Sequence, residues 1–598
     1  MVSTKPHTSA GPKNRPRAPD TPPGDIRPEG ISKWLADTPE FELLLDMAVH
    51  GADLRHISPP TYGHSQNMVL PHHESEITRQ LANELAKGWL TTRPPTGDAH
   101  QTRNAPIFAK DEPGKVRRLT DYSDRDHLGR MRGANAVVDK KALGEAPMDR
   151  PLQLAKAIVW LKQHTGRTPV LLVRDISKAY RRIAVRHADI PHLHTVWRGT
   201  HMWDTRLPFG HAAAAHHCCK LTSAIARALT QRMVGKAVAL AYVDDFIVVA
   251  DPAHAAEAER LLIAMLNDIG MPITPEKAAV SGTWSTVAQW IGYAHDSERE
   301  THSLSPDKLP QLEQLIDDAL RAHRLPTARL TTLVGKLNHV ANVHHPARAH
   351  MQALHRAAAG STHNAAINQQ AQEDLVWWKQ ALQWMPAEAK MSRPPTANSK
   401  CIATDASLSG LGCVLHETRG NSRWSAKPLA ALAAPFVQRA EPKHMMTLEA
   451  IAVLIAISEW GQRLKGSTVW LQLDNQALAF AMQRGRSKCP DANAVLQQIF
   501  TLMIQFQLQI CPFHVMSEDN SQADGLSRLW EPCPSTSALH QNGLTNASAQ
   551  QLHTYSSKMF RHTKQLHATG PASQLQPACR RMTQCTPALH CRLHSADT

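Results

Sequence analysis

Two adjacent acids, Asp244 and Asp245, stand between the apolar runs 240–243 and 246–249. Such runs are typical of two β-strands, and a hairpin formed from them would carry both carboxylates at its tip. Because burying an ionised carboxylate without a partner is costly, the acids predict a compensating cation, for which Mg²⁺ is suited. An exposed turn with two acids at its apex is the alternative.

A third acid strengthens the hypothesis of a metal site. Asp175 ends another apolar run, residues 170–173 followed by Arg174, which predicts a further buried strand. Three carboxylates would give a divalent cation such as Mg²⁺ a set of oxygen ligands. The candidate metal ligands of this first site are therefore Asp175, Asp244 and Asp245.

The pattern Asp-x-x-x-Ala-Tyr over residues 175–180, followed by Tyr-x-Asp-Asp over 242–245, resembles the palm of retroelement reverse transcriptases. The resemblance implies a phosphoryl transfer in which two ions, Mg²⁺ or Mn²⁺, hold the attacking and leaving oxygens. It further implies that Asp175 and Asp244 are the principal metal ligands and that Asp245 supports them. It also implies that the ring of Tyr180 excludes ribonucleotides by a clash with their 2′-hydroxyl group. A tyrosine that only fills the core is the alternative.

Four more residues are implied to bind the incoming dNTP. The stretch 106–121 alternates like two strands around a Pro-Gly turn and resembles the fingers hairpin, in which Lys110 and Arg117 would hold the triphosphate. Gly210 ends a Leu-Pro-Phe-Gly loop that resembles the family's template and nucleotide loop, although His211 follows where the family has serine. Lys277 matches a lysine near the nucleotide phosphates, with a surface lysine as the alternative.

A second set of acids follows after residue 400. Their order is strand-Asp, helix-Glu, strand-Asp and helix-Asp, which resembles the ribonuclease H fold: Asp405, Glu449, Asp474 and Asp524. Four converging carboxylates would again require divalent cations, here two Mg²⁺ or Mn²⁺ that cut a phosphodiester. His514 matches the histidine of that family that assists proton transfer or product release.

Composition agrees with a nucleic-acid partner. Lys plus Arg outnumber Asp plus Glu by 66 to 52, and 35 histidines add to the positive field at mildly acidic pH. The beginning of the chain lacks the apolar core of a secretory signal, and no apolar run is long enough for a membrane span, so the expectation is an intracellular protein, cytoplasmic or nuclear, with no membrane partner. Ten cysteines without a Cys-x-x-Cys pair predict neither a disulfide framework nor an ordinary zinc site.

The fold class expected from these patterns is a multidomain chain of α+β and α/β type. A right-hand polymerase of fingers, palm and thumb would precede an RNase H-like domain with a mixed sheet, and both tails would be disordered. The expected segments are a tail at 1–30, a helical N-terminal extension at 31–100, fingers and palm at 101–295, a helical thumb and connection at 296–391, a linker at 392–399, an RNase H-like domain at 400–530 and a low-complexity tail at 531–598.

The function implied by both resemblances is that of a retrotransposon-type, LTR- or DIRS-like polymerase. It would copy an RNA template from a DNA primer with dNTPs and cleave the RNA strand of RNA–DNA hybrids. A domesticated relic that only binds nucleic acid and an RNA-dependent RNA polymerase are the alternatives. Tyr180 and the attached ribonuclease H pattern disfavour the RNA polymerase, and the presence of all seven acids disfavours the relic. The oligomeric state is left open.

Overall fold

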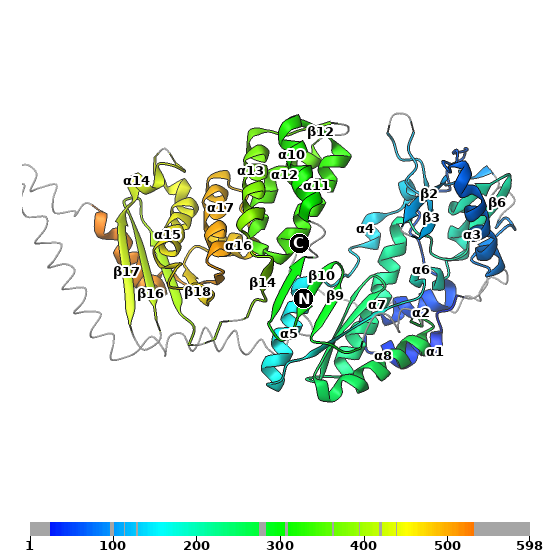
Figure 1. Cartoon of the computed structure of the whole chain (residues 1–598), viewed down its shortest axis with the longest axis horizontal. Helices are drawn as coiled ribbons and strands as arrows, with labels where there is room; N and C mark the ends of the chain where they lie inside the picture. Colours follow the sequence, from blue (N-terminus) through cyan, green and yellow to red (C-terminus); the bar gives the residue numbers. More distant parts are fainter. Residues whose placement is uncertain are drawn as a thin grey trace, which may run out of the picture. The chain divides into compact units, whose positions relative to one another are not determined.

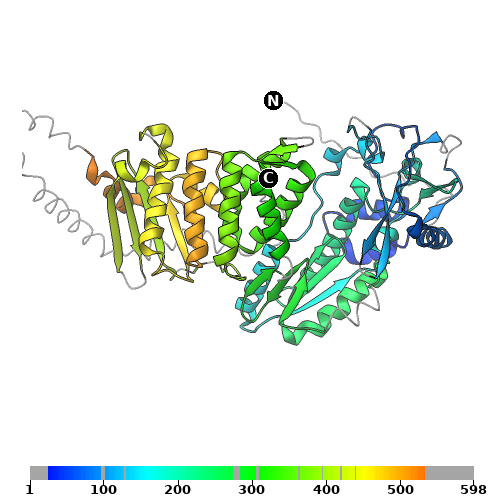
Figure 2. The same cartoon turned by 45° about the horizontal axis from the view of Figure 1, so that its top comes forward.

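The computed structural model describes residues 24–95, 101–112, 114–126, 129–273, 283–304, 309–360, 364–393, 395–396, 398–417, 421–437 and 439–531. They form two compact units, one up to residue 291 together with 295–299, the other comprising 292–294 and the described residues from 300 onwards. Figures 1 and 2 show the elements of each unit from two directions. The predicted tails lie almost wholly outside the described residues, although helix α1 already begins at Pro28.

The centre of the first unit is the predicted hairpin with a third strand beside it. β4 (Val170–Asp175), β8 (Asp245–Ala250) and β7 (Ala237–Tyr242) form an antiparallel sheet in the order β4-β8-β7. The apolar residues form these strands because alternate side chains can be buried on the two faces of the sheet. The prediction of two strands that meet at Asp244 and Asp245 is confirmed.

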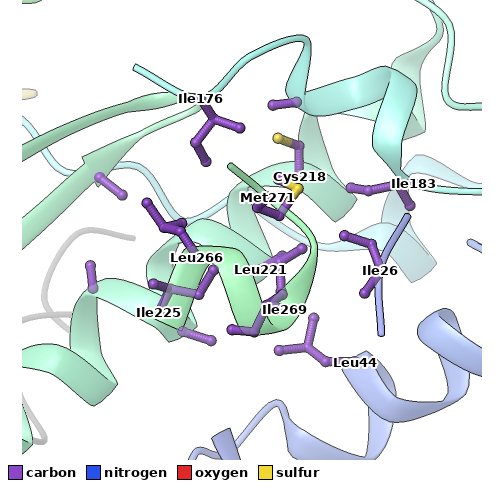
Figure 3. Packing of buried hydrophobic residues seen from close by; sticks show 14 of the residues in the cluster. Ile26, Leu44, Ile176, Ile183, Cys218, Leu221, Ile225, Leu266, Ile269 and Met271 are labelled. Atoms are coloured by element: carbon purple, nitrogen blue, oxygen red, sulfur yellow. The ribbon is translucent and has the colours of Figure 1, made fainter. Parts of the chain in front are cut away.

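Helices α7 (Ala212–Arg232) and α8 (Ala255–Ile269) cover one face of this sheet. Figure 3 shows Leu221 and Ile225 of α7 gathered with Leu266 and Ile269 of α8 in the core. Helix α5 (Pro151–Thr165) also contacts β7 and β8. The acids at the sheet end are therefore carried by a rigid, close-packed support.

The N-terminal helices belong to the same core. Leu44 of α2 (Phe41–His50) and Ile26 lie beside α8 (Figure 3). α1 (Pro28–Leu35) approaches α8 so closely that a Cβ at Gly30 would lie 2.2 Å from the carbonyl oxygen of Asp268, so only glycine fits. Helices α1 and α2 of the predicted N-terminal extension therefore share the core of α7 and α8.

A group of smaller elements completes the first unit. α3 (Glu74–Ala86) packs on the hairpin of β2 (Ile107–Glu112) and β3 (Lys115–Thr120), where Ile77, Leu81 and Ile107 are buried together. The remaining elements are α4 (Lys140–Leu143), α6 (Ala179–Arg182), β1 (Leu90–Thr91), β5 (His194–Trp197), β6 (Thr200–Asp204) and β9 (Val287–Trp290). β1, β6 and β5 form a sheet in that order.

The second unit begins with a helical part. Its core contains Leu312, Leu333, Leu337 and Trp378. The elements are α10 (Leu309–Ala322), α11 (Thr327–Val343), α12 (Gln352–Ala359), α13 (Gln369–Trp384) and the short strands β11 (Thr301–Leu304), β12 (Arg324–Pro326), β13 (Asn364–Ala366) and β14 (Glu388–Lys390). Strand β10 (Tyr293–Asp296) lies where the chain passes from one unit to the other.

A five-stranded mixed sheet forms the rest of this unit, in the order β17-β16-β15-β18-β19. Strands β16, β17 and β18 of this sheet are labelled in Figure 1. β16 is antiparallel to both β15 and β17, whereas β18 is parallel to both β15 and β19. The strands are β15 (Cys401–Ala406), β16 (Gly410–His416), β17 (Ser422–Pro428), β18 (Thr468–Leu473) and β19 (Gln509–His514). The helices are α14 (Leu429–Ala433), α15 (Met445–Trp460), α16 (Gln476–Arg484), α17 (Pro490–Gln505) and α18 (Ser521–Ser527). The predicted multidomain class of mixed helix and sheet is confirmed.

Helices α13 and α17 join the two parts of the second unit. Trp377 Nε1 donates to Thr501 Oγ1 at 3.0 Å, and Gln497 Nε2 donates to Asp374 Oδ1 at 2.9 Å. Ile504 of α17 belongs to the core of the helical part. The two parts that the predicted linker at 392–399 divides in the sequence therefore pack together in the fold. Pro394 and Ala397 of this linker lie outside the described residues.

Within the described ranges, no helix combines the length and the apolar character that crossing a bilayer requires.

Candidate active sites

The first candidate site lies at one end of the β4-β8-β7 sheet. The antiparallel register pairs Asp175 with Asp245, and the backbone N–H of Ile176 donates to the carbonyl oxygen of Asp244 at 3.1 Å. Val243 has a φ of 56°, in the left-handed region, which closes the tight turn between β7 and β8. The fold thus brings the three predicted metal ligands of the palm together.

Two thiols lie beneath this turn. Burial raises the pKa of Cys219 to about 11, and the charge of Asp244 adds to the increase. Burial likewise raises the pKa of Cys218, which has a sulfur in the core shown in Figure 3. Neutral thiols are poor metal ligands because the thiolate is the form that binds. The ligands available to a hard cation here are therefore the carboxylates.

Tyr180 lies beside the same acids. Its ring packs edge-on against Phe209, with ring centroids 4.9 Å apart. Burial raises the pKa of Tyr180, with smaller increases from Cys218, Cys219 and Asp244, so the phenol stays protonated. Phe209 is half exposed and was not predicted as a site residue; its position directly before Gly210 was the only available signal.

Gly210 cannot be replaced by a larger residue without strain. Its φ is 91°, and a Cβ would lie 2.7 Å from the carbonyl oxygen of Thr120. Asn135 fixes the loop, because its Nδ2 donates to the carbonyl oxygen of Gly210 at 2.9 Å and its Oδ1 accepts from the N–H of Ala212 at 2.7 Å. The loop predicted to support template and nucleotide is therefore held on both sides.

His211, which stands where reverse transcriptases have a serine after this loop, has a structural role. Its Nδ1 accepts from the backbone N–H of Ala213 at 3.3 Å and so caps α7, and its Nε2 lies 3.2 Å from His56 Nε2. His56 Nδ1 lies 2.8 Å from Asp189 Oδ1. Burial lowers the pKa of His211 to about 3, so the ring is neutral and can accept the N–H of the helix.

The predicted triphosphate ligands lie on the β2-β3 hairpin. Lys110 and Arg117 are directly opposite one another in the register, so their side chains share one face. Arg117 Nη2 lies 3.3 Å from Glu112 Oε2 while its side chain stays half exposed. The hairpin thus presents two cations on one face. Lys277 lies outside the described residues.

The second candidate site lies on the five-stranded sheet. Asp405 lies on β15, Glu449 on α15, Asp474 directly after β18 and Asp524 on α18. Burial and the charges of Asp474 and Asp524 raise the pKa of Asp405 to about 6, although a hydrogen bond from Ser527 opposes the increase. Burial also raises the pKa of Glu449 to about 8, with added contributions from Asp474 and Asp405. The fold therefore brings these four acids close enough to repel one another.

The oxygen atoms of this cluster suit a divalent cation. Glu449 Oε2 and Asp474 Oδ1 are buried and have no hydrogen-bond donor among the described residues. Carboxylate oxygens without donors are costly to bury, and an all-oxygen set of ligands fits Mg²⁺ or Mn²⁺. The chemistry of these oxygens therefore fits a hard metal ion.

The sequence of this part matches a known family. Residues 396–505 match the RNase H-like domain found in reverse transcriptase. This part of the chain is an RNase H-like domain. The match includes three of the four acids and ends before Asp524, which the structure brings to the others on α18.

Other residues of the RNase H-like domain hold the acids in place and were not predicted. Ser527 Oγ donates to Asp405 Oδ2 at 2.5 Å, Asn475 Nδ2 donates to Glu449 Oε1 at 3.3 Å, and Ser517 Oγ donates to Asp474 Oδ2 at 3.0 Å. Arg528 Nε donates to Asp524 Oδ1 at 2.8 Å. Ser527 and Arg528 follow Asp524 by one helical turn, which was a usable signal.

His514 lies at the end of β19, beside the same cluster. Its Nε2 lies 3.1 Å from the carbonyl oxygen of Asp474, and its side chain is exposed. An exposed imidazole next to the acids can exchange protons with solvent. Its predicted role in proton transfer remains a prediction.

Solved structures similar to this chain include foamy viral proteins. One is the foamy viral protease-reverse transcriptase dRH in complex with ds DNA, at 14% identity and a TM-score of 0.43, covering 82% of both chains. Others are the foamy viral protease-reverse transcriptase with RNA/DNA hybrid (12%, 0.40, 82% of this chain and 63% of that chain) and with dsDNA (14%, 0.41, 82% and 97%). A search of curated proteins gave no match. All three TM-scores lie below 0.5, so these similarities carry no argument about function.

Proposed function

We propose that this chain is an RNA-directed DNA polymerase with an attached ribonuclease H, encoded by a retrotransposon-type element. The observation that carries the proposal is the pairing of Asp175 with Asp245 next to Asp244, in a chain whose residues 396–505 match an RNase H-like domain of reverse transcriptases. An RNase H-like domain of this type supports the presence of a polymerase in the same chain. The proposed segments are fingers and palm at 101–295, thumb and connection at 296–391 and the RNase H-like domain at 400–530.

In the polymerase site, Asp175 and Asp244 would hold two Mg²⁺ or Mn²⁺ ions and Asp245 would support them. The ions would supply charge stabilisation for the attacking primer oxygen and the leaving pyrophosphate. Tyr180 would exclude nucleotides that carry a 2′-hydroxyl group, and Lys110 and Arg117 would bind the triphosphate of the dNTP. Lys277 and Gly210 are further proposed nucleotide contacts, the latter through its backbone.

In the ribonuclease site, Asp405, Glu449, Asp474 and Asp524 would hold a second pair of ions. Bound cations would lower the pKa values of Asp405 and Glu449, because an adjacent positive charge favours the ionised form. The buried oxygens of Glu449 and Asp474 without donors would then gain partners. His514 would move a proton or assist product release from the exposed edge of the site. The proposed partners are an RNA template, a DNA primer, the RNA–DNA hybrid and dNTPs.

The test is primer extension on an RNA template by Asp244→Asn. The substitution keeps the shape of the side chain and removes the charge that would hold metal, so extension should be lost while the melting temperature stays close to that of the wild type. Asp251→Asn is a control because Asp251 is a buried acid of the same region that pairs with Arg167 and lies outside the site. Extension close to the wild-type rate by Asp244→Asn would contradict the polymerase assignment.

A further inference from the structure

Two lysines face one indole ring in the first unit. Lys87 Nζ lies 5.1 Å and Lys178 Nζ lies 5.0 Å from the ring centroid of Trp89. The lysines are 91 positions apart in the sequence, so the fold brings them together. Lys178 lies three residues after Asp175 and two before Tyr180, between two residues of the proposed polymerase site.

The two ammonium groups are close enough to repel one another. Burial lowers the pKa of Lys178, and the neighbouring charge of Lys87 is the next cause. The contacts with the ring of Trp89 are favourable to each ammonium group, but they do not remove the repulsion between the two charges. Two like charges held at one ring are unfavourable unless an anion joins them.

No carboxylate in the described parts of the chain pairs with either lysine. Glu84 is the nearest acid to influence Lys178, and it already accepts hydrogen bonds from Arg118, at 2.8 Å, and from Arg181. Arg181 in turn pairs with the buried Asp204. Both acids of this neighbourhood are therefore engaged by arginines, and the charge of Glu84, which favours the protonated form of Lys178, is shared with Arg118 and Arg181.

The backbone holds this arrangement at a cost. Lys178 has φ 53° and ψ 46°, in the left-handed region that residues other than glycine rarely adopt. Trp89 is fixed because its carbonyl oxygen accepts from the N–H of Thr205 at 3.0 Å and its N–H donates to the carbonyl oxygen of Glu84 at 2.9 Å. Such a conformation persists only where the surrounding structure enforces it, so the backbone fixes the starting point of the Lys178 side chain.

We propose that Lys87 and Lys178, positioned by Trp89, form a binding site for a phosphate group. Phosphate oxygens accept hydrogen bonds from ammonium groups, and an anion between the lysines removes their repulsion. The phosphate belongs either to a nucleoside triphosphate or to the backbone of a nucleic acid, because both carry the same group. Binding of a phosphate group by the two lysines does not require that the chain synthesises DNA. Only the naming of these two phosphate sources rests on the proposed function.

The experiment measures the binding of two probes to the full chain by calorimetry. One probe is inorganic triphosphate, and the other is a short RNA–DNA duplex without nucleotide. The variants are Lys178→Gln, Lys87→Gln and the charge-preserving Lys178→Arg. Lys156→Gln is the matched control, an exposed lysine of α5 with no part in the proposed site.

Either glutamine variant should bind one probe about tenfold more weakly, the size expected for one lost charged hydrogen bond. Lys178→Arg and Lys156→Gln should keep wild-type affinity. The melting temperature of the glutamine variants should stay the same or rise, because a repulsion is removed; a purely structural lysine would lower it on removal. Loss confined to triphosphate assigns the site to the nucleotide, and loss confined to the duplex assigns it to the nucleic-acid backbone.

Unchanged affinity for both probes in both glutamine variants would overturn the phosphate site. An equal loss of affinity in Lys156→Gln would also overturn it, because the loss would then reflect only the lower net charge of the chain. Both measurements are made without DNA synthesis. A wild-type chain that extends no primer but shows the expected binding losses would therefore contradict the proposed function and leave the phosphate site standing.

Discussion

Ser527 donates a hydrogen bond to Asp405 over 2.5 Å, and both side chains are buried. The contact depends on two glycines of β16: a Cβ at Gly410 would lie 2.4 Å from the carbonyl oxygen of Ser527, and one at Gly412 would lie 2.1 Å from that of Ala523. These glycines let α18 approach the sheet. Ser527 is thereby placed as a positioning residue for Asp405.

Replacing Ser527 should shift the pH dependence of RNA cleavage. The hydrogen bond lowers the pKa of Asp405, so its loss in Ser527→Ala should raise that pKa and move the acid limb of the pH profile to higher pH by up to about one unit. Cleavage of an RNA–DNA hybrid across the pH range is the measurement. Ser458→Ala, which removes a hydroxyl bonded to its own helix α15, should leave the limb in place. An unmoved limb in Ser527→Ala would show that the hydrogen bond does not tune Asp405.

Without metal, the unit that contains Glu449 should lose stability as the pH rises. The pKa of Glu449 is about 8 in the folded chain against an ordinary value of 4.5, so the folded state binds more protons between these values and its stability declines across this window. Asp405, with a pKa of about 6 against 3.8, adds to the decline at lower pH. At a pH below the ordinary pKa values of both groups, 3.8 for Asp405 and 4.5 for Glu449, the folded state keeps its full stability relative to high pH.

Urea denaturation with a chelator at about pH 5.5 and about pH 8.5 measures this decline, which should amount to a few kcal/mol. The amide of Glu449→Gln does not ionise between these pH values, so this substitution should remove most of the decline in stability. Added Mg²⁺ should restore stability at the higher pH, because the ion binds the folded state. Equal stability of the wild type at both pH values would contradict the raised pKa.

The positions of the acids could be predicted from the sequence because each follows a local pattern. Asp244 and Asp245 interrupt two apolar runs, and Asp405 and Asp474 end strands, so hydrophobic periodicity placed them. The contact between Ser527 and Asp405 joins residues 122 positions apart, and no local pattern encodes it. The same holds for Lys87 and Lys178.

Local sequence patterns also did not predict how distant segments pack against one another. The bond from Trp377 to Thr501 unites the predicted connection with the RNase H-like domain, although the change of composition at the predicted linker suggested separation. Similarly, nothing local indicated that Gly30 must be a glycine because of Asp268. Such contacts depend on the assembled core.

Removing the ring of Tyr180 should admit ribonucleotides. Tyr180→Ala or Tyr180→Val would take away the group that clashes with a 2′-hydroxyl and should lower discrimination between dNTP and rNTP at least about tenfold. Tyr180→Phe keeps the ring and its edge-on contact with Phe209, so it should discriminate like the wild type. Single-nucleotide incorporation kinetics measure the ratio. An unchanged ratio in Tyr180→Ala would mean that Tyr180 only fills the core.

Gly210→Ala should destabilise the first unit more than a matched substitution at Gly114. Both glycines have positive φ, but a Cβ at Gly210 meets the carbonyl oxygen of Thr120 at 2.7 Å, whereas one at Gly114 meets nothing within 4 Å. The positive φ alone should lower the free energy of unfolding of Gly114→Ala by about 1 kcal/mol. The additional clash should lower that of Gly210→Ala by about 3 kcal/mol. Chemical denaturation compares them. Equal losses would show that the loop relaxes away from Thr120.

We propose that two separate carboxylate sites perform two reactions. A paired assay tests it on one RNA–DNA substrate, labelled on the primer for extension and on the RNA for cleavage. Asp405→Asn should lose cleavage and keep extension, Asp244→Asn should lose extension and keep cleavage, and a chelator should abolish both because each site would need divalent ions. Loss of both activities in Asp405→Asn with an unchanged melting temperature, or retention of both in either variant, would show that the two sites do not perform separate reactions.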